Sequence, residues 1–428
     1  MDVLILTFPG DGMKSLQQMD LFRCVSESYA VVPDRPLDNS ALYNIVAAKC
    51  GISTEKLSEK TAIGKAGAER SLIKRSIRWH QQTLKHMGLL EKVPAQRGLW
   101  QLTKEGKRKL HRAAPGVTLL AFSTDLGIAI WGDCRQVFSS LDVPIHLVIT
   151  SPPYPLRQPR AYGNPKESEY VDFICSALEP VVAKLADGAS VCLNISNDIF
   201  EQGSPARSLY VERLVIALND RLGLSLMDRL IWHNPSKPPG PVLWASIKRV
   251  QLNVAYEPVF WFTNNPRAVR SDNRRVLEPH TERHKRLIAA GGCQHEAEYA
   301  DGAYRRKVGS YGNDTPGRIP RNVISLGHQC ADHKEYRRDC EELGLPKHGA
   351  PMPLSLPDFL IRFMSLPGDL VADPFGGKLT TAMAAETLGR RWICSEWIYE
   401  YVRGASERFK KCAGFQDGFG TKVAHELY

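Results

Sequence analysis

The amino-acid sequence predicts an α/β protein in which a largely parallel sheet is preceded by a small basic domain of helices and a β-hairpin. Short apolar, β-branched runs such as 146–150 and 370–373 indicate buried strands, and amphipathic helical segments lie between such runs. The net charge of +10 is concentrated in residues 51–112, which hold fifteen Lys/Arg against five Asp/Glu. A basic surface confined to one small unit is typical of nucleic-acid binding.

Composition limits the classes of protein that fit this chain. Its 428 residues are enough for two or three domains, and 43% hydrophobic residues indicate an ordinary globular core. No apolar run approaches the ~18 residues that span a bilayer, and the N-terminus lacks a secretory signal, so we expect no membrane partner. Ten scattered cysteines without a Cys-x-x-Cys pair indicate buried thiols, a cytoplasmic location and no metal site.

Residues 37–113 predict a winged helix, in which helices are followed by a β-hairpin; residues 1–36 are an extension with a short apolar run at 4–8. A Ser or Thr N-cap at 53–54 opens one helix, and Gly88 ends the longest helix, 71–87. The expected phosphate contacts lie on this helix and in the hairpin turn: Lys74, Arg75, Arg78, Lys85 and Arg97. The Gly88–Leu90, Arg97–Thr103 and Gly106 pattern resembles the N-terminal domain of Mrr-type restriction proteins. A protein-contact module is the alternative.

Residues 117–263 form the first half of the predicted sheet. Strands are expected at 129–134, 146–150, 189–195, 226–232 and 257–263, with a helix at 170–185 and an irregular loop at 234–240. The strand at 146–150 stops at once, because the prolines that follow donate no N–H to a ladder. Ligands bind at the carboxyl ends of strands in such sheets, so Ser151 and Tyr154 are expected in the site. A flat ring beside oxygen acceptors suits a base turned out of a nucleic acid.

Residues 264–346 lack a regular apolar period and carry clusters of basic residues interleaved with tyrosines. A stretch this long without a regular pattern is usually functional or disordered. We therefore expect a nucleic-acid recognition region, with a disordered loop of solvated charges as the alternative. The expected phosphate and base-edge contacts are Arg274, Arg275, Arg305, Arg306 and Lys307.

Residues 347–414 form the second half of the predicted sheet, and residues 415–428 are a tail. A strand at 369–373 is followed by an acidic tip, two glycines and a helix that begins near Thr380. Glycines let a ligand approach the backbone, and the helix N-terminus supplies N–H donors. The next strand ends at Glu396, whose carboxylate can bind two ribose hydroxyls. The glycines do not match Gly-x-Gly-x-x-Gly, which favours a cofactor without a pyrophosphate.

Thr150–Tyr154 and Asp373–Gly377 resemble the two hallmark motifs of S-adenosylmethionine-dependent DNA amino-methyltransferases. The catalytic motif precedes the cofactor motif, as in the β group, which implies a Rossmann-like sheet in circularly permuted motif order with 264–346 as target-recognition region. The resemblance implies a catalytic loop of Ser151, Pro152, Pro153 and Tyr154. It implies that S-adenosyl-L-methionine is held by Asp373, Pro374, Phe375, Gly376, Gly377, Thr380, Glu396, Trp397, Asp133 and Pro351. Lys378 and Leu379 are bulkier than the family's residues there, which predicts altered cofactor affinity.

The activity that the resemblance implies is methyl transfer to an exocyclic amine in double-stranded DNA. Within the family, a serine at position 151 favours N4 of cytosine over N6 of adenine. Transfer to C5 of cytosine is disfavoured, because it needs a cysteine after a proline and the sequence has no Pro-Cys dipeptide. A cognate restriction endonuclease is a candidate partner. The alternatives are N6-adenine methylation, RNA methylation, and a DNA-binding regulator with a degenerate methyltransferase half.

Overall fold

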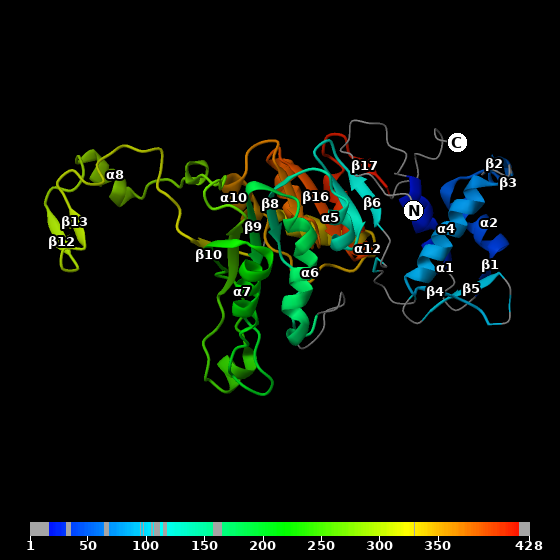
Figure 1. The fold of residues 1–428 in the computed structure, drawn as a ribbon, viewed down its shortest axis with the longest axis horizontal. Helices are drawn as coiled ribbons and strands as arrows, with labels where there is room; N and C mark the ends of the chain where they lie inside the picture. Colours follow the sequence, from blue (N-terminus) through cyan, green and yellow to red (C-terminus); the bar gives the residue numbers. More distant parts are fainter. Residues whose placement is uncertain are drawn as a thin grey trace.

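The computed structural model places a central sheet between an N-terminal domain and an extended arm, so that the molecule is elongated (Figure 1). It describes residues 17–30, 36–63, 68–94, 96, 98–103, 106, 112–113, 118–156, 165–328 and 330–418. Within these ranges, no helix is both long and apolar enough to cross a membrane.

Ten strands of the described chain form the central sheet, in the order β14-β10-β11-β9-β8-β15-β16-β7-β6-β17. The five in its middle, from β9 to β7, run parallel to one another, which confirms the predicted largely parallel sheet. Strands β8 and β15 are neighbours, although their last residues lie 223 positions apart in the sequence. The strands are β6 (Thr118–Ser123), β7 (Gly127–Gly132), β8 (Ile145–Thr150), β9 (Leu185–Asn194), β10 (Ser225–His233), β11 (Tyr256–Thr263), β14 (Val323–Ser325), β15 (Leu370–Asp373), β16 (Arg391–Glu396) and β17 (Gln416–Asp417).

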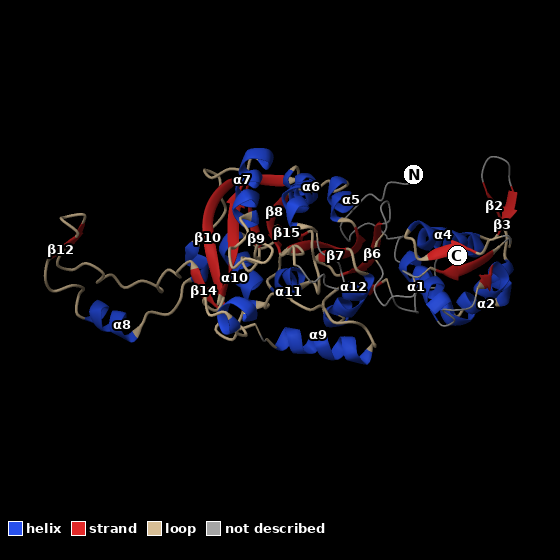
Figure 2. Cartoon of the chain, turned by 90° about the horizontal axis from the view of Figure 1, so that it is seen from below, coloured by secondary structure: helices blue, strands red, loops and turns tan. Residues whose placement is uncertain are grey.

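Helices cover both faces of this sheet (Figure 2). One face is covered by α5 (Cys134–Ser139), α6 (Tyr170–Val182) and α7 (Tyr210–Leu222), and the other by α10 (Ser355–Met364), α11 (Thr380–Thr387) and α12 (Tyr399–Ser406). Successive side chains of a strand point to opposite faces. In β8, Leu147 and Ile149 accordingly enter one hydrophobic cluster and Val148 enters the other. Because helices bury both faces of the sheet, a ligand can reach polar groups of the strands at the strand ends.

The N-terminal domain has the predicted helices and hairpin. Its elements are α2 (Asn39–Cys50), α3 (Thr54–Ser58), α4 (Leu72–His86), the strands β1 (Leu37–Asp38), β5 (Leu99–Leu102) and β4 (Leu90–Lys92) of one sheet, and a second hairpin of β2 (Thr61–Ile63) and β3 (Ala68–Arg70). Ser53 caps α3 by accepting from the Lys56 N–H, which agrees with the Ser or Thr cap predicted there. Ser71 caps α4 in the same way, by accepting from the Lys74 N–H.

Two expectations for the N-terminal part are wrong. Residues 17–30 are not a separate extension: they form α1 (Gln17–Ala30), which packs on α4 and brings the Phe22 ring to 5.0 Å from Trp131 of β7. This helix therefore joins the N-terminal domain to the sheet. Cys24 of α1 and Cys50 of α2 form a disulfide, contrary to the expectation that all ten cysteines are thiols. The short apolar run at 4–8 lies outside the described residues.

The region 264–346 divides into an arm and a return to the core. The base of the arm is the 3-10 turn η3 (Asn273–Val276), which packs on α10. The helix α8 (Glu282–Ala289) and the hairpin of β12 (Ala297–Tyr299) and β13 (Tyr304–Arg306) extend away from the sheet (Figure 1). After the arm, β14 pairs with β10, and α9 (Ala331–Glu342) packs against α12. The expectation of one irregular region is thus wrong for its last third. Short turns complete the fold: η1 (Glu167–Glu169), η2 (Val242–Ile247) and η4 (Glu407–Phe409).

Candidate active site

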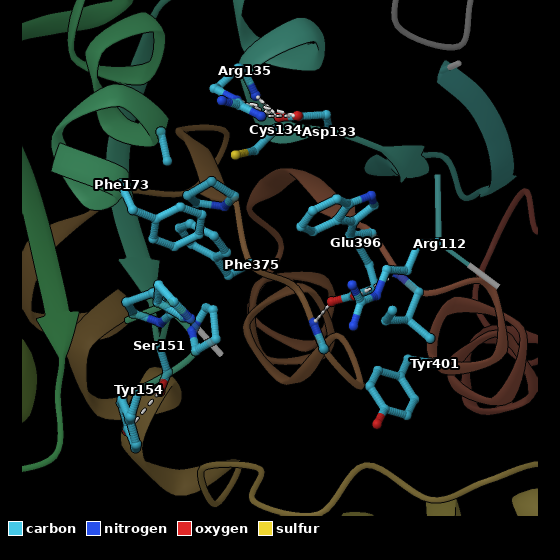
Figure 3. Close-up of a pocket in the computed structure, with 18 of the residues that line it drawn as sticks. Arg112, Asp133, Cys134, Arg135, Ser151, Tyr154, Phe173, Phe375, Glu396 and Tyr401 are labelled. Carbon is cyan, nitrogen blue, oxygen red and sulfur yellow. Dashed lines mark hydrogen bonds and ion pairs between the residues drawn. The ribbon is translucent and has the colours of Figure 1, made fainter. Parts of the chain in front are cut away.

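A cavity of about 400 Å³ lies at the carboxyl ends of β7, β8, β15 and β16 (Figure 3). It brings together ten residues that the sequence singled out: Asp133, Ser151, Pro152, Pro153, Tyr154, Pro374, Phe375, Gly377, Glu396 and Trp397. Both predicted motifs therefore border one space. Other lining residues carry no local sequence motif, and these include Arg112, Arg135, Phe173, His348 and Tyr401.

Asp373 links the two motifs from beneath this cavity. Its side chain is 1% exposed and accepts a hydrogen bond from the Thr150 hydroxyl at 2.7 Å. It also accepts from the Thr381 hydroxyl at 2.8 Å and from the Phe375 N–H at 3.0 Å. Burial raises the pKa of Asp373 to about 6, although these donors favour the carboxylate. Asp373 thus fixes the end of β8 against the glycine loop and does not itself line the cavity.

Glu396 presents a carboxylate to the cavity from the end of β16. One oxygen accepts the Gly377 N–H at 2.6 Å, and the other accepts the Ile398 N–H at 2.7 Å. The Trp397 N–H also acts as a donor to this carboxylate, which retains acceptor capacity for a ligand hydroxyl. Burial raises the pKa of Glu396 to about 7. The carboxylate is therefore oriented by the glycine loop before any ligand binds.

The glycine loop approaches the neighbouring strand too closely for larger side chains. A Cβ atom on Gly376 would lie 2.7 Å from the Leu379 Cδ2 and 3.1 Å from the carbonyl oxygen of Ser395. Gly377 has φ +54°, a left-handed conformation that favours glycine. Both glycines are consequently required by the loop's shape, even though Gly377 alone of the two lines the cavity.

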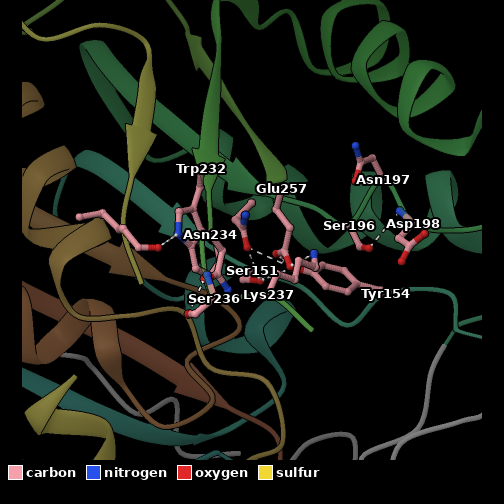
Figure 4. Close-up of polar contacts among 12 residues, drawn as sticks. Ser151, Tyr154, Ser196, Asn197, Asp198, Trp232, Asn234, Ser236, Lys237 and Glu257 are labelled. Carbon is pink, nitrogen blue, oxygen red and sulfur yellow. Dashed lines mark hydrogen bonds and ion pairs between the residues drawn. The ribbon is translucent and has the colours of Figure 1, made fainter. Parts of the chain in front are cut away.

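Ser151 and Tyr154 share a hydrogen-bond network at the other side of the cavity (Figure 4). Their hydroxyl oxygens are 3.0 Å apart, and both groups contact the Asn194 Oδ1, at 3.2 and 3.0 Å. The Tyr154 hydroxyl also lies 3.3 Å from the Glu257 carboxylate, which accepts from the Lys237 ammonium at 3.1 Å. Burial, followed by the Glu257 charge, raises the pKa of Tyr154 well above its ordinary value.

The sequence prediction missed the three residues that support Ser151 and Tyr154. Asn194 has the clearest signal, because it is the last residue of a buried strand and therefore lies at the same sheet edge as Ser151. Its side-chain nitrogen is buried, with no hydrogen-bond partner in the described part of the chain. Lys237 and Glu257 flank the irregular loop between β10 and β11, and their pairing depends on the tertiary fold.

Lys378 and Leu379 do not crowd the cavity. The Lys378 side chain is 1% exposed, and its ammonium donates to Asp332 of α9. Arg408 donates to the other oxygen of Asp332 and to the Lys378 carbonyl. Leu379 is fully buried in the apolar core. The large side chains of Lys378 and Leu379, from which altered cofactor affinity was predicted, thus lie on the side of the glycine loop away from the cavity.

Four residues predicted to bind the cofactor do not line the cavity: Asp373, Gly376, Thr380 and Pro351. Pro351 is buried, and its neighbours His348 and Ala350 reach the cavity in its place. Asp133 does line the cavity, where it caps α5 and pairs with Arg135. Burial acts to raise the pKa of Asp133, but the hydrogen bonds from Arg135 outweigh it and hold that pKa below its ordinary value.

The basic residues expected to contact DNA differ in accessibility on the N-terminal domain. Arg75 and Lys85 of α4 are exposed, whereas Lys74 and Arg78 are half-buried. The Lys74 ammonium lies 5.6 Å from the centre of the Tyr43 ring. Arg97 lies outside the described residues. Of the residues predicted to contact phosphates on α4, Arg75 and Lys85 therefore lie on its exposed side.

The arm shows a similar division. Arg274, Arg305 and Lys307 are exposed, and Arg306 lies over the Tyr299 ring with 5.8 Å between charge and ring centre. Arg275 is different, because its guanidinium donates to the carbonyls of Ser365 and Arg270 at 2.9 and 2.7 Å. Arg275 therefore fastens the base of the arm to the core.

Comparison with known proteins agrees with this geometry. Residues 145–407 match the N6/N4 family described as DNA methylase, and residues 28–112 match the family described as Mrr N-terminal domain. The type II methyltransferase M.PvuII of Proteus hauseri is 34% identical over 298 residues, which cover 68% of this chain and 85% of that protein. M.BglII of Bacillus subtilis, also a type II methyltransferase, is 23% identical over 267 residues, covering 61% and 63%.

A solved structure gives the same relationship. The PvuII DNA methyltransferase, described as cytosine-N4-specific, is 30% identical with a TM-score of 0.52, covering 67% of this chain and 87% of that one. The family match spans more than half of the chain, and the identity to M.PvuII extends over most of that relative's length. This protein belongs to the N6/N4 DNA methylase family.

Proposed function

We propose that this chain is a site-specific DNA methyltransferase that transfers a methyl group from S-adenosyl-L-methionine to N4 of cytosine in duplex DNA. The observation that carries the proposal is the shared cavity, in which the Ser151 loop faces the Glu396 carboxylate and the glycine loop. The hydrogen bond from Thr150 to Asp373 holds these two parts together. The serine at 151 and the similarity to a cytosine-N4-specific enzyme favour cytosine over adenine.

The residues present fit this cofactor. Glu396 retains acceptor capacity for the ribose hydroxyls, and the small glycine loop lets a ligand approach the backbone. Phe375 and Trp397 supply apolar ring surface at the cavity wall. When bound, S-adenosylmethionine supplies a methyl group activated by its sulfonium charge.

The protein's own contribution is to orient the amine. The Ser151 hydroxyl donates to the Asn194 Oδ1, so its oxygen lone pairs remain available to accept a proton of the exocyclic amine. The Pro152 carbonyl would accept the other proton, which aims the nitrogen lone pair at the methyl group. The hydroxyl of Tyr154 is held by Asn194 and Glu257, and stacking of its ring on the extruded base contributes ~1–3 kcal/mol.

The surroundings of the site suggest how the duplex is held. The exposed cations of α4 and of the arm would contact phosphates, with the arm as target-recognition region. We further propose that the protein acts in the cytoplasm beside a restriction endonuclease of the same specificity. DNA from cells that contain the methyltransferase should then resist that endonuclease, and cleavage of fully methylated DNA would contradict the pairing.

Transfer by the purified protein tests the proposal. Ser151→Ala should lower kcat at least about hundredfold, as expected when one positioned hydrogen bond to the reacting group is lost. The Kd for S-adenosylmethionine should not change, because Ser151 belongs to the base side of the cavity. Ser58→Ala, an exposed serine of α3, is the matched control. Wild-type turnover by Ser151→Ala would overturn the catalytic assignment.

A further inference from the structure

The connection between β10 and β11, residues 234–255, leaves the sheet beside the catalytic loop. β10 ends and β11 begins at the pair His233 and Tyr256, and β11 lies antiparallel to β9, whose last residue is Asn194. Lys237, near the start of the connection, reaches Glu257 next to Tyr154. In Figure 1 the connection projects from the edge of the sheet at which α6 begins. It therefore extends on the side from which a base must enter.

This connection exposes an unusual number of large apolar side chains. Leu252 is 86% exposed, Ile247 is 65% exposed, and three more belong to the same short stretch: Val242, Leu243 and Val250. Contiguous exposed apolar surface generally marks a binding site. The stretch is compact, because a backbone hydrogen bond from the Val254 N–H to the Gly240 carbonyl, at 2.8 Å, closes the connection around η2. Its apolar tip is thus presented on a fixed support.

The charges of the connection indicate its partner. Residues 234–255 contain Lys237, Lys248 and Arg249 and no acidic residue, and the last two are exposed next to the apolar tip. Cations beside exposed apolar side chains match a nucleic-acid duplex, in which phosphates flank stacked bases. Proteins that distort a duplex often insert apolar side chains between its base steps. A base taken out of the stack leaves a gap of that kind.

We propose that residues 241–252 form a wedge that enters the duplex beside the target base, with Leu252 filling the space that the extruded base leaves. Lys248 and Arg249 hold the adjacent phosphates. This inference rests on the proposed function, because it takes duplex DNA as the substrate. It assigns extrusion to a segment that contributes nothing to the lining of the cavity.

The test compares two duplexes that carry a site mapped by sequencing DNA from cells expressing the chain. In one, the target base is paired; in the other, it lies opposite an abasic position and is already weakly held. On the paired duplex, Leu252→Ala should lower kcat at least about tenfold, because unstacking the target base costs a few kcal/mol. On the abasic duplex that cost is largely absent, so Leu252→Ala should react at close to the wild-type rate. Leu252→Phe should keep activity on both. Ile216→Ala, an exposed apolar residue of α7, is the matched control.

A second readout does not depend on methyl transfer. The fluorescence of a 2-aminopurine placed next to the target base should increase when the wild-type protein binds. The increase should be much smaller when Leu252→Ala binds. Equal behaviour of Leu252→Ala and wild type, or an equal loss on both duplexes, would overturn the wedge. The wedge would also be overturned if the wild-type protein were a dimer and Leu252→Ala were a monomer, because a second copy would then cover the apolar tip. Absence of transfer by the wild-type chain would instead refute the proposed function.

Discussion

Cofactor affinity should depend on pH through Glu396. Burial raises the pKa of this carboxyl group to about 7, and it must be ionised to accept two ribose hydroxyls. An acid with a raised pKa is neutral below that value, so binding should strengthen as pH rises from 6 to 8. At pH 6 about one tenth of the groups are ionised, which weakens the affinity about tenfold, or about 1.4 kcal/mol, relative to pH 8 and above.

Isothermal titration of S-adenosylmethionine at several pH values measures this dependence. Glu396→Gln is the control, because it has no titrating group and keeps one carbonyl acceptor; its affinity should be weak and nearly independent of pH. Asp373, with a pKa of about 6, titrates at the lower end of the range but does not line the cavity. A wild-type affinity that stays constant from pH 6 to 8 would refute the assigned role. The same pH profile in Glu396→Gln would show that another group titrates.

Three further predictions follow from single contacts. Lys378→Met should destabilise the fold by about 3 kcal/mol in urea unfolding, because Asp332 would lose one of the two buried cations that the described part of the chain pairs with it. Arg75→Ala should weaken DNA binding at every sequence and reduce the slope of log K against log salt by about 1, as measured by anisotropy. Tyr154→Phe keeps the ring but loses the hydroxyl network, so kcat should fall about tenfold with an unchanged cofactor Kd.

Each of these results has an outcome that contradicts the reasoning. A Lys378→Met protein as stable as wild type would show that the Asp332 pair contributes nothing. An unchanged salt slope for Arg75→Ala would remove the exposed side of α4 from the DNA interface. If Tyr154→Phe weakened cofactor binding but not turnover, Tyr154 would belong to the other half of the cavity.

Local chemistry explains why much of the site could be predicted from the sequence. A β-branched run that stops at two prolines places Ser151 at a strand end whatever the distant sequence is. The same holds for Asp373 and Glu396, which end neighbouring strands of the sheet. These residues are found because their positions follow from strand boundaries. The N-cap of α3 was predictable for the same local reason.

The rest depends on contacts between distant residues. Asn194 meets Ser151 across 43 positions, and no periodicity encodes that meeting. The arginine pair at 274–275 shows the limit clearly, since one member is exposed and the other is bound to core carbonyls. Helix α9 was missed because its surface is mostly charged, with Tyr336 as its main buried anchor. Its role, holding Lys378 through Asp332, appears only in the folded chain.

The most direct test of the central claim is mass spectrometry of nucleosides from DNA of cells that express this chain, with Ser151→Ala cells in parallel. We predict N4-methylcytosine in DNA from wild-type cells and its absence from Ser151→Ala cells. N6-methyladenine in its place would retain the enzyme but contradict the assigned base. DNA without any new methylated base, from cells that contain folded protein, would contradict the account as a whole.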